Sequence, residues 1–230
     1  MMQEILERNG IFLRETQSGK MAAFCRLLLE YNQKFNLTAI TDEDEIAVKH
    51  VADSVKGLPY LPEKGRIIDI GSGAGFPSVP LIVASEGSER EFVLLDSLMK
   101  RVGFLNEVIR QLDLRNAKAV HARAEDESKT EREGFDCAIA RAVAPLNVLV
   151  EYALPLLKTG GRLVAYKGTD PEGECENAKR ALTELGGEVE KIEKYRLDGT
   201  YERSFIIVKK VKKTPLKYPR GQNKPRIMPL

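Results

Sequence analysis

The fold is indicated by Ile67-Ile68-Asp69-Ile70-Gly71-Ser72-Gly73-Ala74-Gly75-Phe76-Pro77, an apolar strand that leads into a glycine-rich turn and the start of a helix. Glycines at alternate positions let the backbone of the turn pass close to a ligand. The first turn of the following helix adds free N–H groups, which attract polar or anionic groups. The stretch therefore predicts a binding site for a nucleotide-like cofactor.

Two common nucleotide-binding motifs fit this turn less well. The dinucleotide fingerprint G-x-G-x-x-G/A has a small residue at its sixth position, where this chain has Phe76. The turn also lacks the Gly-Lys-Ser/Thr sequence of nucleoside triphosphatases, and with it the lysine and the hydroxyl that hold phosphates and magnesium. An NAD-dependent oxidoreductase stays open as an alternative, whereas a triphosphatase is not expected.

Short apolar runs alternate with helical patterns after this stretch. Strands are expected at 66–70, 91–95, 117–122, 135–140 and 162–167, and helices after Phe76, at 98–112, at 146–157 and after Pro171. Two last strands, at about 188–196 and 203–211, flank an Asp198-Gly199 turn that is typical of an antiparallel hairpin. The pattern predicts an α/β fold with a Rossmann-like, mostly parallel seven-stranded sheet that helices cover on both faces.

The residues before the sheet have helical patterns. From Lys20 to Phe35, apolar residues recur every three or four positions. A second helix is expected after Thr41-Asp42, with acidic residues in its first turn, and continues to Pro59. We therefore divide the chain into a helical N-terminal extension (1–60), an α/β domain (61–211) and a C-terminal tail (212–230).

Charge is distributed unevenly along the 230 residues, although the net charge is only +2. From Lys209 to Leu230 there are eight basic residues and no acidic one, so the preceding 208 residues carry a net charge of −6. A basic terminus on an acidic body indicates a polyanionic partner. Four of the eleven prolines fall in the last sixteen residues, which predicts an irregular, extended tail that follows a phosphate backbone. The alternative is that the tail packs over the cofactor site.

Composition and cysteine spacing exclude several classes of protein. Hydrophobic residues make up 43% and charged residues 30%, as in soluble globular proteins. Neither an apolar stretch of membrane-spanning length nor a signal-peptide pattern occurs, so we expect a cytoplasmic protein without a membrane partner. Cys25, Cys137 and Cys175 are far apart, and His50 and His121 stand alone, so neither a disulfide framework nor a metal site is expected.

Acidic residues near the turn resemble the first two motifs of class I S-adenosylmethionine-dependent methyltransferases. Asp69 stands two positions before the first glycine, and Asp96 ends the next expected strand. By this resemblance the turn holds the methionine part of S-adenosylmethionine, and Asp96 accepts hydrogen bonds from the ribose hydroxyls. The alternative is that the two aspartates only cap helices.

Further motifs narrow the resemblance to one family. They are Asn36-Leu37-Thr38-Ala39-Ile40, His50-Val51-Ala52-Asp53-Ser54, Gly75-Phe76-Pro77, Leu95-Asp96-Ser97 with Lys100-Arg101, Arg123-Ala124-Glu125, Arg141-Ala142 and Lys167-Gly168. Together they are similar to the glucose-inhibited division protein B family, bacterial 16S ribosomal RNA methyltransferases that modify guanine at N7. Lys217-Tyr218-Pro219-Arg220 also resembles the carboxyl ends of members, whereas residues 221–226 depart from them.

The resemblance implies a set of cofactor contacts at the carboxyl ends of the parallel strands. This set consists of Gly71, Gly73, Phe76, Asp96, Ser97, Ala124, Glu125 and Arg141. Ala124 and Glu125 would receive the adenine. Arg141 directly follows an apolar strand, so it contacts either the cofactor, a phosphate or a structural acidic partner.

Basic residues at the same strand ends are candidates for contact with RNA. The candidates are Lys100, Arg101, Arg123 and Lys167, together with Lys217 and Arg220 in the tail. Positive charge on one rim of a sheet neutralises phosphates, although any single one of these residues is also compatible with an ordinary surface charge. The expected partner is 16S ribosomal RNA or the small ribosomal subunit, and the chain is expected to act as a monomer.

The sequence identifies no catalytic acid or base, and guanine N7 needs none, because its in-plane lone pair carries no proton. His50 and Asp53 lie one helical turn apart, and we expect them to fix the extension to the sheet rather than to act as an acid–base pair. His121 is expected to be packed, and Cys137 is too far from the strand ends to act as a nucleophile. A non-catalytic RNA-binding protein stays open as a second alternative.

Overall fold

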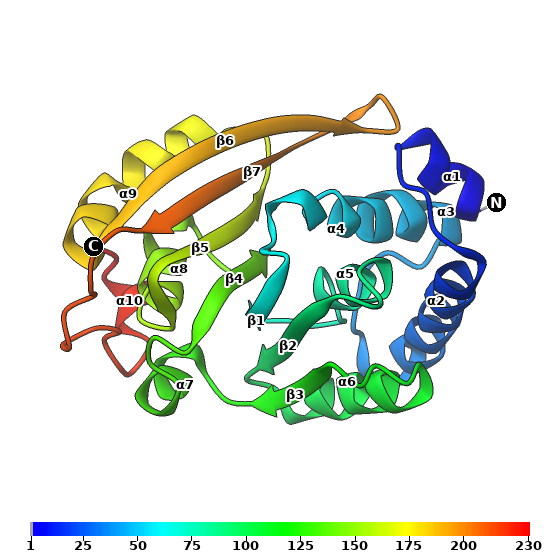
Figure 1. Cartoon of the computed structure of the whole chain (residues 1–230), viewed down its shortest axis with the longest axis horizontal. Coiled ribbons are helices and arrows are strands. Elements are labelled where there is room, and N and C mark those ends of the chain that lie inside the picture. The colour runs from blue at the N-terminus through cyan, green and yellow to red at the C-terminus, as the bar shows by residue number, and fades with distance from the viewer. Residues whose placement is uncertain (1) are drawn as a thin grey trace.

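The computed structural model describes residues 2–230 and contains one seven-stranded sheet between two layers of helices (Figure 1). The strands lie in the order β3-β2-β1-β4-β5-β7-β6, and β7 runs antiparallel to the other six. Their bounds are β1 Lys64–Ile70, β2 Glu89–Asp96, β3 Ala117–His121, β4 Phe135–Arg141, β5 Leu157–Lys167, β6 Gly187–Leu197 and β7 Tyr201–Lys210. The predicted Rossmann-like sheet is confirmed.

Helices pack on both faces of the sheet because its central strands are apolar on both sides. In β1, Ile67 belongs to one hydrophobic cluster and Ile68 to the other. The first cluster contains residues of α5 (Ser78–Ala84) and α6 (Met99–Gln111). The second contains residues of α7 (Ala124–Thr130), α8 (Leu146–Ala153) and α9 (Pro171–Leu185).

Two boundaries within the α/β domain differ from the sequence prediction by more than two residues. Helix α8 ends at Ala153 instead of continuing to residue 157, because Pro155 has no N–H with which to extend the helix. Strand β5 consequently begins at Leu157 rather than at residue 162. The predicted hairpin is confirmed, and Asp198 and Gly199 at its turn both have positive φ angles, of 48° and 68°.

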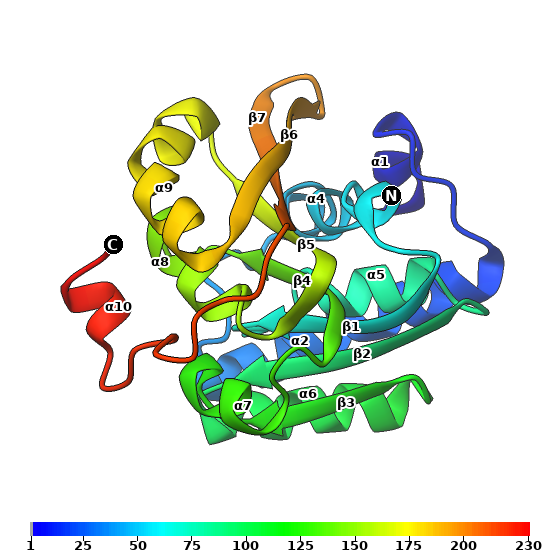
Figure 2. The ribbon, with the colours of Figure 1, turned by 60° about the vertical axis from the view of Figure 1, so that its left-hand side comes forward.

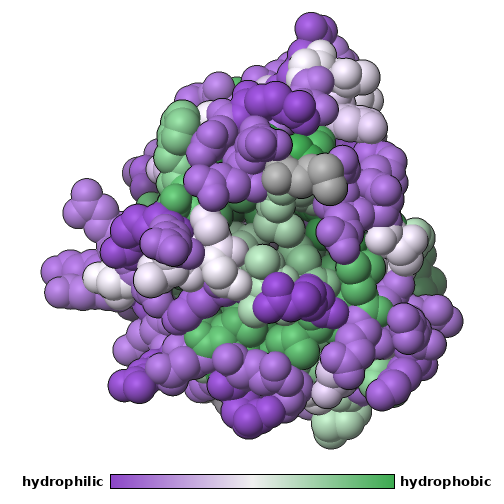
Figure 3. Space-filling view, turned by 90° about the vertical axis from the view of Figure 1, so that its right-hand side faces the viewer, coloured by the Kyte–Doolittle hydropathy of each residue, from purple (hydrophilic) through white to green (hydrophobic). Residues whose placement is uncertain are grey.

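The N-terminal helices pack against the first hydrophobic cluster. They are α1 (Met2–Arg8), α2 (Glu15–Phe35), α3 (Glu43–Ile46) and α4 (Asp53–Val55), and a short 3₁₀ turn follows at Leu58–Tyr60. The second predicted helix is not continuous, because Ala47–Ala52 forms a π-helical stretch between α3 and α4. Figure 3 shows the side of the molecule near α1 and α2, where charged and polar side chains surround apolar surface.

The C-terminal tail folds back over the helices of the second cluster and ends in α10 (Lys224–Ile227) (Figure 2). Its Thr214 and Tyr218 are only 4% exposed. The Arg132 side chain donates hydrogen bonds to the carbonyl oxygens of both residues, at 2.9 Å and 2.8 Å. The expectation of an extended tail is therefore wrong. Among residues 2–230, no helix has the length and apolar character that crossing a membrane requires.

Candidate cofactor and substrate site

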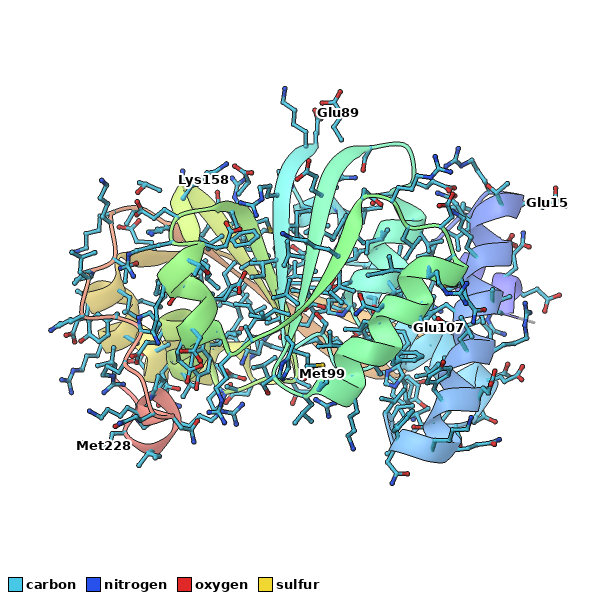
Figure 4. The ribbon with its side chains drawn as sticks, turned by 90° about the horizontal axis from the view of Figure 1, so that it is seen from below. Glu15, Glu89, Met99, Glu107, Lys158 and Met228 are labelled. Atoms are coloured by element: carbon cyan, nitrogen blue, oxygen red, sulfur yellow. The ribbon has the colours of Figure 1, made fainter. Side chains whose placement is uncertain are left out.

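The carboxyl ends of the parallel strands meet along one edge of the sheet. In Figure 4, Glu89 and Lys158, near the starts of β2 and β5, lie at the opposite edge from Met99, which follows β2, and Met228 of the tail. Two pockets open along the carboxyl edge, with volumes of about 460 Å³ and 570 Å³. Both are lined by Ala142 and Val143, in the loop after β4, so the two pockets adjoin.

Gly71, the first residue of the glycine turn, lines the smaller pocket, here called the first pocket. Gly71 has a φ of +74°, and a Cβ atom at this position would lie 2.9 Å from Cγ2 of Val143. The backbone conformation and the close approach of the loop after β4 therefore both disfavour a side chain at this position. The backbone N–H groups of Gly71 and Ser72 donate to the Leu95 carbonyl, which ties the turn to the end of β2.

Asp96 lies at the end of β2 with its carboxylate in the first pocket and is 3% exposed. It accepts hydrogen bonds from the backbone N–H groups of Gly73 and Leu98, both at 2.9 Å. The Arg101 guanidinium lies 3.4 Å from the same oxygen that Gly73 contacts. Among residues 2–230, the other oxygen, Oδ1, accepts only from Leu98, so one of its two lone pairs is available to a ligand.

The opposite wall of the first pocket comes from the start of α7. Ala124 and Glu125 line it and are 7% and 8% exposed. Ser97 also lines this pocket, and its carbonyl oxygen lies 3.1 Å from Nε2 of His121. His121 is exposed, contrary to the prediction of a packed side chain, because β3 is an edge strand.

The residues of the first pocket fit S-adenosylmethionine. Asp96 and Glu125 are hydrogen-bond acceptors, which match the ribose hydroxyls and the adenine amine, and the alanines allow a flat ring to approach. The volume lies in the range of small-molecule sites. A further acidic group, Asp69, lies buried behind the turn. Its Oδ2 accepts from the Ser78 hydroxyl, and its Oδ1 has no hydrogen-bond partner within the described part of the chain. Burial raises the pKa of Asp69 to about 6.

The tail adds two residues to the first pocket that the sequence analysis did not identify, Asn223 and Arg226. Nη2 of Arg226 donates to the Val143 carbonyl at 2.9 Å. Arg220 does not face solvent as an RNA contact would, because it pairs with the buried Glu151 of α8 at 2.7 Å. Lys217 stays exposed and lies 3.2 Å from Glu184.

Three predicted cofactor contacts, Gly73, Phe76 and Arg141, do not line the first pocket. The backbone N–H of Gly73 donates to Asp96 instead. The Phe76 ring packs between the rings of Phe24 and His50, with centroid distances of 5.1 Å and 4.6 Å. The Arg141 guanidinium lies 5.1 Å from the Phe76 ring. Phe76 therefore supports the turn from behind, and Arg141 belongs to the larger pocket, here called the second pocket.

Arg141 holds the π-helical stretch against the end of β4. Its Nη1 donates to Asp53 and to the Lys49 carbonyl, both at 3.0 Å, and its Nη2 lies 3.2 Å from Nδ1 of His50. Tyr195 of β6 donates to the other Asp53 oxygen at 2.7 Å. The prediction that His50 and Asp53 fix the extension to the sheet is confirmed. Burial and the neighbouring Arg141 lower the pKa of His50 to about 4, so its ring is neutral at pH 7.

Lys167 and Glu174 form an ion pair that lines the second pocket. Nζ of Lys167 lies 2.6 Å from Oε2 of Glu174 and donates to the Ala144 carbonyl at 2.9 Å. The Lys167 side chain is only 8% exposed, so it is not part of an open basic rim. Oε2 of Glu174 also accepts from the Leu146 N–H at 2.7 Å, which anchors the start of α8.

The remaining basic candidates lie near the mouth of the first pocket. Lys100 is exposed, and its Nζ lies 3.4 Å from the Phe35 carbonyl. Arg123 is exposed, lines the first pocket and forms no ion pair with another residue of the described chain. Arg101 is half-buried beside Asp96. Of the residues predicted to contact RNA, Lys100 and Arg123 are thus exposed and form no ion pair within residues 2–230. The others each pair with an acidic residue: Arg101, Lys167, Lys217 and Arg220.

Comparison with known proteins identifies the family. The family described as rRNA small subunit methyltransferase G matches residues 17–205. This chain belongs to that family. A relative called ribosomal RNA small subunit methyltransferase G in Acetivibrio thermocellus is 46% identical over 96% of this chain and 92% of its own length. One of the same name in Alkaliphilus metalliredigens is 43% identical over 96% and 94%. The predicted resemblance, methyl transfer as the reaction and S-adenosylmethionine as the cofactor are confirmed.

Solved structures share the fold at low sequence identity. Cofactor-bound Rv0187 from MTB has a TM-score of 0.59 at 15% identity, over 84% of this chain and 90% of that chain. NSun6 from Pyrococcus horikoshii, solved with SFG, has a TM-score of 0.56 at 17% identity, over 72% and 52%. Both similarities support the class I methyltransferase fold that this family member adopts.

Proposed function

We propose that this protein transfers a methyl group from S-adenosylmethionine to N7 of a guanosine in small-subunit ribosomal RNA. One observation carries the proposal: a second pocket adjoins the first, and each carboxylate in it already pairs with a cation. Asp53 pairs with Arg141, Glu174 pairs with Lys167, and His50 has a pKa of about 4. Such a pocket suits a nucleophile that carries no proton, as guanine N7 does.

The first pocket would hold the cofactor through groups of this chain. Asp96 would accept from the ribose hydroxyls and Glu125 from the adenine amine, while the backbone of Gly71 and Gly73 would face the methionine part. When bound, the cofactor supplies an electrophilic methyl group on its sulfonium. The chain contributes orientation, since holding two reactants in line can lower a barrier by roughly 7–11 kcal/mol.

RNA would approach along the carboxyl edge of the sheet. Lys100, Arg123 and Lys224 are exposed there or in the adjoining tail, and none of them pairs with an acidic side chain among residues 2–230. Such cations neutralise phosphates. The target base has to leave its stack to enter the second pocket, which favours a loop or another irregular region of the RNA.

Two alternatives are less well supported. An NAD-dependent oxidoreductase lacks support because Phe76 occupies the position of the small residue in the dinucleotide fingerprint. A non-catalytic RNA-binding protein would not need a formed pocket with two acidic residues. A cheap discriminating measurement is the melting temperature, which we expect S-adenosylhomocysteine to raise and NADH to leave unchanged.

The proposal is tested by transfer of a labelled methyl group. We expect label from S-adenosylmethionine to enter small-subunit ribosomal RNA or intact small subunits, and large-subunit RNA to stay unlabelled. We also expect the protein to act in the cytoplasm. We expect it to be a monomer, which sedimentation of the purified protein would check. Label in large-subunit RNA at the same rate would contradict the choice of substrate.

A further inference from the structure

The second pocket contains a donor and an acceptor side by side, the Lys167 ammonium and the Glu174 carboxylate. Lys167 uses two of its three N–H groups, on the Ala144 carbonyl and on Oε2 of Glu174. Oε1 of Glu174 accepts no hydrogen bond from residues 2–230, and the Glu174 side chain is 32% exposed. One donor and one acceptor are therefore available at a fixed spacing.

Asp53, the other acidic residue of this pocket, is not available in the same way. Both of its oxygens are engaged, by Arg141 at 3.0 Å and by the Tyr195 hydroxyl at 2.7 Å, and it is 3% exposed. Breaking that pair would leave a buried charge without a partner, which is costly. Glu174 is therefore the carboxylate of the second pocket that can accept a hydrogen bond from a ligand.

The pair matches one edge of guanine. The Watson–Crick edge of guanine presents an acceptor, O6, next to a donor, N1–H. Adenine presents the reverse order, a donor at the exocyclic amine next to an acceptor at N1. An ammonium beside a carboxylate complements guanine and opposes adenine, and enzymes read an extruded base through this edge.

We propose that Lys167 and Glu174 read the target guanine, with Lys167 donating to O6 and Oε1 of Glu174 accepting from N1–H. This assignment rests on the proposed function and names the residues that select the base. It leaves N7 free of contacts, as methylation requires. Methylation at N7 makes the base cationic and its N1–H a stronger donor, so the hydrogen bond to Glu174 strengthens as the methyl group is transferred.

The proposal is tested by binding, without methyl transfer. Once the methylated nucleotide is mapped, splinted ligation places guanosine, inosine or adenosine at that position in small-subunit RNA. Affinity is measured by filter retention with S-adenosylhomocysteine present. We expect the unmodified protein to bind guanosine RNA about tenfold more tightly than adenosine RNA, as a good pair of base contacts does. Inosine RNA, which keeps O6 and N1–H, should bind within about threefold of guanosine RNA.

The decisive variant is Glu174→Gln. Its amide can also donate to N1 of adenine, so the preference for guanosine over adenosine should fall below about threefold, a loss within the usual value of one base contact. Glu172→Gln is the matched control, because Glu172 lies on the same helix, pairs with Lys194 at 2.7 Å and does not line the second pocket. It should keep the full preference.

Two checks separate base reading from a structural effect. Glu174→Gln should keep its melting temperature and its affinity for S-adenosylhomocysteine; if it fails to fold, Lys167→Gln replaces it, and its preference should also fall. A folded variant that keeps the guanosine preference would overturn the assignment. A methyl group mapped to a base other than guanine would instead overturn the proposed function, so the two failures are distinguishable.

Discussion

The guanidinium of Arg220 forms a two-point ion pair with the carboxylate of Glu151: Nε lies 2.9 Å from Oε1 and Nη2 lies 2.7 Å from Oε2. The Arg220 backbone N–H donates to the same carboxylate at 2.8 Å. Glu151 is fully buried in α8, so the tail supplies the only cation that pairs with it among residues 2–230. This pair fixes the tail over the helices and places Asn223 and Arg226 in the first pocket.

Arg220→Ala is therefore expected to destabilise the protein. It leaves the Glu151 carboxylate buried without a partner, which typically lowers the free energy of unfolding by about 3–5 kcal/mol. Lys217→Ala is the control, because its pair with Glu184 is exposed and contributes little to stability. Urea denaturation measures both, and equal midpoints for the two variants would contradict the anchoring role of Arg220.

Arg226 is expected to support cofactor binding. Arg226→Ala removes one wall of the first pocket and the hydrogen bond that holds the Val143 carbonyl, so affinity for S-adenosylhomocysteine should fall by about two- to tenfold, the value of one hydrogen bond. Calorimetry measures the affinity. Lys224→Ala, in the same short helix but outside the pocket, should bind the cofactor as the unmodified protein does.

The tail should contribute less to RNA binding than its charge indicates. Deleting residues 214–230 removes four basic side chains, but Lys217 and Arg220 already pair with acidic partners. Phosphate contacts are then expected only from Lys224 and Arg226, which corresponds to a drop of about one to two units in the salt slope of binding. A drop of about three to four units would show that all four basic residues contact phosphates, as expected of an extended tail.

Asp96 is expected to determine cofactor affinity. Asp96→Ala removes the proposed acceptor for the ribose hydroxyls, and hydrogen bonds to a charged group contribute about 1.5–3 kcal/mol each. Affinity for S-adenosylmethionine should fall tenfold or more. Asp126→Ala is the control, since Asp126 is exposed beside the pocket and pairs with Lys129. Calorimetry on folded Asp96→Ala protein that gives unchanged affinity would refute the assignment.

Asp69 should make stability depend on pH. Burial raises its pKa from the ordinary 3.8 to about 6. Between these values the folded chain binds more protons than the unfolded chain, so the contribution of Asp69 to the free energy of unfolding falls as pH rises. Asp69→Asn removes this contribution. The free energy of unfolding of the variant, relative to that of the unmodified protein, should therefore be about 2 kcal/mol higher at pH 7.5 than at pH 4.5. Denaturant titrations at both pH values check the sign, and an equal difference at both would show that Asp69 does not titrate in this range.

The sheet and the acidic strand ends could be predicted because they depend on local patterns. Apolar runs of strand length, the glycine turn and the Asp-Gly hairpin each determine their own backbone, and parallel strands bring their carboxyl ends to one edge. Asp96 therefore lies at the carboxyl edge as the local pattern predicts, and Glu125, which only the family resemblance placed there, lines the same pocket. Arg141 was placed at the correct edge, but its partner Asp53 lies 88 residues away, and no local pattern links them.

The fold of the tail could not be predicted from its composition. Prolines and lysines indicate an extended chain, whereas the structure depends on one buried acidic residue in another element. The available signal is Glu151 itself, an acid within the apolar run Val148-Leu149-Val150-Glu151-Tyr152-Ala153-Leu154. A charge in such a run requires a partner, but the sequence does not say which of many arginines supplies it.

The proposed function depends on methylation of guanine at N7, which chemical cleavage tests most directly. Small ribosomal subunits that lack the modification are incubated with the protein and S-adenosylmethionine, and their RNA is then reduced with borohydride and treated with aniline, which cuts the chain at N7-methylguanosine. We expect one new cut, at a guanosine in a loop or other irregular region, and a weaker cut with Asp96→Ala protein when S-adenosylmethionine is limiting. Methylated RNA that stays intact, with the methyl group on a pyrimidine carbon or an exocyclic amine, would contradict it.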